Sequence, residues 1–355
     1  MPSIATRRCS AFRVTRGAAY SRPASRLGWG ALEGAGVLSG SGESVSRADA
    51  GEPRTSIEAL DQARVVSARS RLGQQLVDLW RSRALLALLV RTELKVKYKN
   101  SVLGFAWSML NPALYLVVFY IVFQIILGSG IPNFPIFLLS GLLVWNLFGA
   151  ALGGGTAAVT GAAAIVKKVS FPRSVLPLSS VGAGLVHFFL QAVVLVAALV
   201  LFQYSVGWRY LWLLPLALGV LLILASAFAV FLAAVNVSLR DTAHFVELAL
   251  LAWFWMTPIV YPFRLVADRA SPLVAVWFLN PVIWIVVAFQ RAIYNRAIAV
   301  NVANGERSVT KILPVDVTGW WYAWHLLIVG AVSIVLFLGA LAYFGRREGD
   351  FSEEL

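Results

Sequence analysis

The stretch that decides the fold is residues 91–127, RTELKVKYKNSVLGFAWSMLNPALYLVVFYIVFQIIL. It begins with closely spaced basic residues and continues as a nearly uninterrupted run of apolar residues, broken mainly at Asn111–Pro112. A helix needs about 20 consecutive apolar residues to cross the hydrocarbon core of a bilayer. Lysine and arginine beside such a segment favour its cytosolic end. The stretch therefore predicts a membrane span over residues 104–127 that begins at the cytosolic face.

The composition of the whole chain extends this pattern. Of its 355 residues 59% are hydrophobic and only 13% are charged, whereas a soluble domain carries roughly 25% charged residues. The net charge of +13 does not indicate a nucleic-acid partner, because the basic residues flank apolar segments instead of forming one polar face. We expect an all-α integral membrane bundle of six helices, with the further spans over residues 135–152, 175–202, 211–237, 246–261 and 321–344.

An apolar segment between the last two predicted spans, residues 271–295, is split by Asn280–Pro281 and closed by Arg291. Each half is too short to cross a bilayer alone. The pattern predicts a pair of short helices dipping into the outer interface, and a full seventh span is the competing interpretation.

The distribution of lysine and arginine predicts the orientation. Basic residues gather before the first span, at residues 167–173 and at residues 346–347, and the loop over residues 128–133 has no charge. This alternation places both termini in the cytosol. The segment after the fifth span also carries six basic residues, but long segments translocate largely regardless of charge.

The N-terminal part differs from the rest and predicts two further regions. Residues 1–70 show no sustained apolar periodicity, which indicates a disordered cytosolic extension or an upstream start codon; their Arg-rich, acid-poor beginning also resembles a transit peptide. Residues 71–100 alternate leucines with arginines, so we expect an amphipathic helix in the membrane plane or a simple juxtamembrane anchor. The six-span domain then covers residues 101–348.

The chemistry that the sequence lacks narrows the function. There is no G-x-x-x-x-G-K-[ST] stretch, so the chain is not expected to be its own ATPase or to bind a nucleotide cofactor. The single cysteine, Cys9, and the three histidines form no metal-site pattern. Carboxylates deep in the spans, which a proton-driven carrier would use, are missing. A non-enzymatic pore or exporter remains, and no metal is expected.

Two histidines, His187 and His325, fall inside predicted spans. An ionisable side chain inside a membrane is by default a hypothesis of function. A neutral histidine packed and hydrogen-bonded within the bundle is the other interpretation, and the residues favour it.

Aromatic residues indicate a path for a sugar chain. In the first span they recur every four residues on one drifting face, and a second group lies around the fifth span. Aromatic faces stack on sugar rings, although helix packing and interfacial belts use the same residues. The predicted glycan path is Trp107, Tyr115, Phe119, Phe123, Trp253, Trp255 and Tyr261.

Three stretches carry a resemblance to a known family: RTELKVKYKNSVLGFAWSMLNPALYLVVFYIVF (91–123), IVKKVSFPRSVLPL (165–178) and NVSLRDTAHFVELALLAWFWMTPIVYP (236–262). Together they strongly resemble the permease subunit of type-2 ATP-binding-cassette exporters, in the branch that exports O-antigen, teichoic acid and mycobacterial-type galactan. The resemblance extends from about residue 75 to the C-terminus.

The resemblance implies a homodimer in the bacterial plasma (inner) membrane, with two separate ATPase subunits that hold ATP and magnesium. A coupling helix would then seat in a groove of each ATPase, with Phe171 as an apolar knob. Its residues would be Val166, Lys167, Lys168, Phe171, Pro172 and Arg173.

The substrate that the resemblance implies is a polyprenyl-diphosphate-linked polysaccharide. Its anionic diphosphate would be attracted to basic residues beside the first span, Arg91, Lys95, Lys97 and Lys99, and the outer gate would contain Asn280 and Pro281. A type-2 permease for drugs or lipids, a stand-alone channel or carrier, and an integral-membrane glycosyltransferase are the alternatives.

Overall fold

The computed structural model describes residues 72–99, 107–128, 130–169, 171–269, 272–303, 306–314 and 317–355, all within one contact unit, Ser56–Leu355. The predicted extension over residues 1–70 and the S-V-L-G motif at residues 101–104 lie outside these ranges. The described elements are α2 (Leu72–Arg81), α3 (Arg83–Tyr98), α4 (Trp107–Phe119), η2 (Tyr120–Ile126), α5 (Phe134–Gly161), α6 (Ala163–Val166), α7 (Val175–Leu201), η3 (Trp208–Tyr210), α8 (Leu213–Ser238), α9 (Thr242–Met256), α10 (Phe263–Ala267), α11 (Pro272–Phe278), α12 (Pro281–Ile293), β1 (Ile298–Ala303), β2 (Glu306–Lys311), α13 (Gly319–Arg347) and α14 (Phe351–Glu354).

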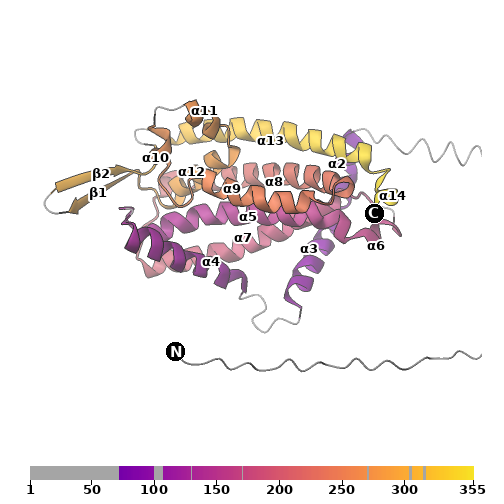
Figure 1. Cartoon of the computed structure of the whole chain (residues 1–355), viewed down its shortest axis with the longest axis horizontal. Helices are drawn as coiled ribbons and strands as arrows, with labels where there is room; N and C mark the ends of the chain where they lie inside the picture. The colour runs from indigo at the N-terminus through magenta and orange to yellow at the C-terminus, as the bar shows by residue number, and fades with distance from the viewer. Residues whose placement is uncertain are drawn as a thin grey trace, which may run out of the picture. The chain divides into compact units, whose positions relative to one another are not determined.

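Four long helices, α5, α7, α8 and α13, form the bundle and lie side by side (Figure 1). They contain 28, 27, 26 and 29 residues, and each is apolar enough to cross a membrane. At about 1.5 Å per residue they are roughly 39–44 Å long, which exceeds the bilayer core of about 30 Å. The second, third, fourth and sixth predicted spans are therefore confirmed as helices of membrane-crossing length.

The other two predicted spans are shorter apolar helices. The first consists of α4 followed by a seven-residue π-helix, η2, and the fifth is the 15-residue α9. Neither reaches the length of the four bundle helices, so the count of six spans stays a prediction.

The predicted break at Asn280–Pro281 is confirmed, since α11 and α12 meet at an angle of 76°. The Asn280 side chain caps α12 by accepting a hydrogen bond from the backbone N–H of Val282, and Pro281 occupies the first helical turn, where its missing N–H costs nothing. The two halves differ in burial. Large apolar side chains of α11 are exposed, whereas α12 is packed inside the bundle.

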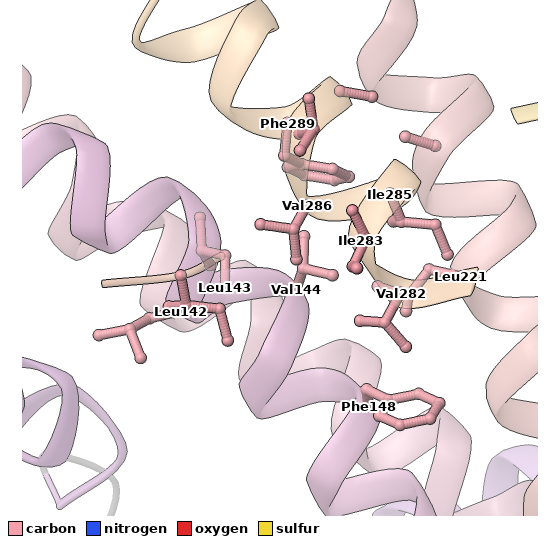
Figure 2. Close-up of a cluster of buried hydrophobic side chains, with 14 of the residues drawn as sticks. Leu142, Leu143, Val144, Phe148, Leu221, Val282, Ile283, Ile285, Val286 and Phe289 are labelled. Atoms are coloured by element: carbon pink, nitrogen blue, oxygen red, sulfur yellow. The ribbon is translucent and has the colours of Figure 1, made fainter. Parts of the chain in front are cut away.

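The core is densest where α12 enters it. Val282, Ile283, Ile285 and Val286 of α12 are 0% exposed, and Figure 2 shows them grouped with Val144 and Phe148 of α5 and Leu221 of α8. Branched side chains at these spacings fill the space between three helices. The second half of the predicted outer pair is thus a core element of the bundle.

A β-hairpin, which the all-α prediction missed, follows α12. Strands β1 and β2 pair antiparallel with Ile298 opposite Lys311 and Ala303 opposite Glu306. The signal is present in the sequence, because Asn304–Gly305 between two alternating segments is typical of a tight hairpin turn. The hairpin, α10 and α11 lie at one end of the bundle, here called the hairpin end, and α6 and α14 lie at the other, the α6 end (Figure 1).

Hydrogen bonds from tyrosines join three connections at the hairpin end. The Tyr294 hydroxyl, after α12, donates to the Pro132 carbonyl before α5, at 2.7 Å. The Tyr204 hydroxyl, after α7, donates to the Tyr294 carbonyl. The two tyrosine rings also stack.

Candidate transport site and coupling surface

Helix α3 packs against α7 (Figure 1). Gly182 of α7 permits the approach, because a Cβ at that position would lie 2.7 Å from Cγ2 of Val90. One turn further along α3, Glu93 accepts a hydrogen bond from the Ser179 hydroxyl at 3.5 Å. Burial raises the pKa of Glu93, and hydrogen bonds from Ser180 and Ser179 and the charge of Lys97 lower it in part.

The C-terminal turn of α3 brings a lysine and a tyrosine to one histidine of α7. The Lys97 ammonium lies 3.3 Å from His187 Nε2, and the Tyr98 hydroxyl lies 3.2 Å from His187 Nδ1. All four residues of the predicted lipid-diphosphate entrance, Arg91, Lys95, Lys97 and Lys99, are exposed. The structure therefore does not gather all four basic side chains, and it places only the Lys97 ammonium against α7.

A cavity of about 380 Å³ lies beside this contact. Its polar lining comes from α3, α5 and α7, and Trp107 of α4 supplies an aromatic wall. The side-chain NH₂ of Asn146 in α5 donates to the side-chain oxygen Oε1 of Gln191 in α7 at 2.9 Å. The sequence named Lys97 and Trp107 as site residues and raised His187, but it missed Tyr98, Asn146 and Gln191.

Three of the four aromatic residues predicted in the first span, Tyr115, Phe119 and Phe123, form a continuous row. Tyr115 stacks on Phe119 at 6.1 Å between ring centroids, and Phe123 follows at 5.9 Å. Phe119 also stacks on Phe254 of α9. Tyr115 is 47% exposed and Trp107 is 50% exposed, so the row has an accessible side.

The aromatic residues predicted around the fifth span do not share one surface. The Trp253 ring packs on Phe148 and Phe228, and its N–H donates to the side-chain oxygen Oδ1 of Asn280 at 2.9 Å. Trp255 is exposed, and its backbone carbonyl accepts a hydrogen bond from Tyr261. Trp253 is therefore joined to the predicted gate residue Asn280, a contact that the sequence did not predict.

The predicted coupling segment lies at the α6 end, and its apolar residues are arranged differently from the prediction. Val166 is 3% exposed in a core cluster with Val237 and Phe344, and Phe171 packs against the same cluster. Ile165 and Val169 are instead the exposed apolar side chains, at 50% and 55%. Their spacing of four residues places them on one face of a helical turn, and they flank the exposed Lys167 and Lys168.

Arg173, the last residue of this segment, is tied to the end of α13. Its backbone N–H donates to the Glu348 carboxylate at 3.0 Å, and its guanidinium donates to the Glu348 carbonyl. Burial raises the pKa of Glu348, and the hydrogen bond and charge of Arg173 lower it in part. Beyond Glu348, Phe351 is 0% exposed, and Glu354 accepts from the Ser238 hydroxyl at 2.7 Å. Pro172, beside Arg173, is half-buried.

These features define a multi-pass helical membrane protein with a polar cavity inside the bundle and an exposed basic turn at one end. Residues 84–294 match the ABC-2 type transporter family, and the chain belongs to it. Membership places the chain in a membrane and implies an ATP-binding-cassette partner. Among the described residues, no cluster of histidine, cysteine and carboxylate side chains has the makeup of a metal site.

Curated relatives share much of the chain. An O-antigen export system permease protein RfbA of Myxococcus xanthus is 32% identical over 278 residues, which are 78% of this chain and 98% of that protein. A Klebsiella pneumoniae protein of the same name is 30% identical over 211 residues, which are 59% of this chain and 80% of that protein.

Proposed function

We propose that this chain is the transmembrane subunit of an ATP-driven exporter that moves a polyprenyl-diphosphate-linked polysaccharide, either O-antigen-like or a cell-wall galactan, out of the cytosol. The observation that carries the proposal is the similarity to an O-antigen export permease over 98% of that relative's length. The subunit acts as a homodimer in the bacterial plasma membrane, with both termini in the cytosol.

The basic residues of α3 support the first step of this function. Arg91, Lys95 and Lys99 are exposed on α3, and a lipid diphosphate is strongly anionic. Each exposed basic residue near a membrane surface contributes about 1 kcal/mol of attraction to anionic lipid. The lipid tail stays in the bilayer while the sugar chain passes along Tyr115 and Phe119.

The turn at the α6 end supports coupling to a separate ATPase that holds ATP and magnesium. Ile165 and Val169 offer an apolar contact on either side of two lysines, and Val166 and Arg173 fix the turn to the core and to the end of α13. A push on this turn is therefore transmitted to the bundle helices through the buried Val166 and through the bond between Arg173 and Glu348.

The test is depletion of the chain in its native host, followed by analysis of lipid-linked glycans. We expect polyprenyl-linked polysaccharide to accumulate on the cytosolic side and to disappear when the wild-type chain is restored. A double substitution, Ile165→Asp with Val169→Asp, should express and fold but fail to restore export, because it removes only the exposed apolar contact. Arg209→Gln, an exposed basic residue far from this turn, is the matched control.

Two results would contradict the proposal. Depletion without any accumulated lipid-linked glycan would favour a permease for drugs or lipids. Labelling of a cysteine introduced at Lys167 by a membrane-impermeant reagent added outside the cell would place the turn on the wrong side.

A further inference from the structure

The polar cavity beside His187 lies near the middle of the bundle helices. His187 is about 18 Å along α7 from Val175, and Asn146 is about 18 Å from one end of α5 and about 22 Å from the other. Polar side chains at that depth are costly in a membrane protein unless they bind one another, water or a substrate. Two amides, a histidine, a tyrosine and a lysine at one depth therefore require an explanation.

The contacts of His187 fix its hydrogen-bonding state. A lysine ammonium can only donate, so His187 Nε2, 3.3 Å away, accepts from Lys97. The proton of a neutral imidazole is then on Nδ1, which donates to the Tyr98 hydroxyl at 3.2 Å. His187 thus holds the ammonium in place without neutralising it, and Lys97 makes no ion pair with any described residue.

The amide pair keeps further hydrogen-bonding capacity. The one bond between the two side chains uses one Asn146 N–H and the Gln191 oxygen. Asn146 Oδ1 and the Gln191 NH₂ group make no side-chain hydrogen bond to described residues, and both side chains are half-buried at the cavity wall. An acceptor and a donor side by side match the hydroxyl and amide groups of a sugar.

We propose that this cavity binds the junction between the phosphate and the first sugar of the lipid-linked glycan. This inference rests on the proposed function and adds a recognition site to it. Lys97 contacts a phosphate oxygen, the Asn146–Gln191 pair hydrogen-bonds the first sugar, and the exposed Trp107 ring covers one sugar face. The volume of about 380 Å³ falls in the range of roughly 300–1,000 Å³ that small-molecule sites occupy.

In this proposal, Lys97 has a different role in lipid binding from the other three basic residues of the predicted entrance. Arg91, Lys95 and Lys99 attract the anionic lipid through solvent, so their effect falls as salt screens it. Lys97 is also exposed, but its ammonium lies at the cavity wall beside His187. Its proposed contact with the phosphate is direct, and salt screens a direct contact less than an attraction over a longer distance. Substitution at Lys97 should therefore speed dissociation, and substitution at Lys95 should mainly slow association.

The experiment measures lipid binding by the full chain in phosphatidylcholine nanodiscs, using native mass spectrometry and competition. The probes are undecaprenyl diphosphate, undecaprenyl-diphospho-N-acetylglucosamine and phosphatidylglycerol. We expect Lys97→Gln to weaken both diphosphate lipids about tenfold or more, and Lys97→Arg to retain most of the binding. Asn146→Ala should weaken only the sugar-bearing lipid, by about fivefold to tenfold. Arg81→Gln removes the same charge from exposed helix α2 and should change each dissociation constant less than about twofold.

Three results would overturn the inference. One is equal binding by Lys97→Gln and Arg81→Gln, with both variants as thermally stable as the wild type. Another is a loss in Asn146→Ala that is the same for the bare and the sugar-bearing diphosphate. The third is competition by phosphatidylglycerol as strong as by the diphosphate lipids, which would make the cavity a general lipid-phosphate site. Each leaves the proposed function intact, because that function is tested by glycan accumulation on depletion.

Discussion

Two asparagines inside the bundle have opposite surroundings. Asn280, at the hairpin end, accepts hydrogen bonds from the Val282 backbone and from Trp253, and donates to the Thr257 hydroxyl at 3.1 Å. Asn146, at mid-depth, makes one side-chain hydrogen bond, to Gln191. Asn280 is buried, whereas Asn146 borders a cavity.

The difference separates two uses of a polar side chain in a membrane bundle. A side chain whose donors and acceptors are used within the protein fixes the structure, because removing it strands its partners. A side chain that keeps free capacity beside a cavity contributes little to folding and is available to a substrate. Asn280 thus holds α9, α11 and α12 together, and Asn146 is part of a binding surface.

The largest expected effect comes from Asn280→Ala. The substitution leaves the Trp253 N–H without a partner, removes the bond that the Thr257 hydroxyl accepts, and removes the cap of α12. We expect a loss of about 2–4 kcal/mol of folding stability, seen as a lower midpoint in thermal or denaturant unfolding of the purified chain. Asn146→Ala should lose less than about 1 kcal/mol. Equal losses of folding stability for the two variants would contradict the distinction between a structural Asn280 and a binding Asn146.

A second prediction concerns the two faces of α5 near its end. A Cβ at Gly155 would lie 2.6 Å from the Ala229 Cβ and 3.1 Å from its Cα, whereas a Cβ at Gly153 would meet nothing within 4 Å. Gly155→Ala should therefore push α5 and α8 apart and cost about 1–3 kcal/mol. Gly153→Ala is the matched control and should be neutral, or stabilising by up to about 1 kcal/mol, since alanine favours a helix. The measurement is the same unfolding midpoint. If Gly155→Ala leaves it unchanged, α5 and α8 lie further apart at this contact than the structure shows.

The smallest effect is expected at the α6 end, and it depends on pH. Burial raises the pKa of Glu348 above its ordinary value of 4.5, so the folded chain favours the protonated form. Its contribution to stability is present below pH 4.5 and is lost as pH rises through the raised pKa. Glu348→Gln keeps an acceptor for Arg173 and should gain about 2 °C in midpoint over the wild type between pH 4.5 and 7.

The control for this pH effect is Glu247→Gln, which changes an exposed carboxylate of α9. It should show no such divergence from the wild type. A wild-type midpoint that rises relative to Glu348→Gln over the same pH range would mean that the Arg173 contact outweighs burial.

The long helices and the break at Asn280–Pro281 were predictable because their signals are local. Uninterrupted apolar runs predict helices of membrane-crossing length, and Asn-Pro predicts a cap followed by a first helical turn. Membership in the ABC-2 family was also predictable from the sequence, because each of its motifs, such as residues 165–178, lies within one short segment.

The features that the sequence did not predict depend on contacts between distant segments. The bond between Asn146 and Gln191 joins α5 to α7, and nothing in either helix indicates the other. Phe171 was expected to be the exposed apolar residue of the coupling turn, but it packs against a cluster that contains Val237 and Phe344. Hydrophobicity alone does not say whether a side chain faces its own core or a partner.

The tyrosine contacts at the hairpin end have a mechanical consequence. Pro132, Tyr204 and Tyr294 belong to three separate connections, and two hydrogen bonds join them in series. A loop held in this way does not swing alone, since its displacement pulls on the next. Any displacement of one of these three connections therefore moves the other two with it, so the hairpin end responds to a force as one unit.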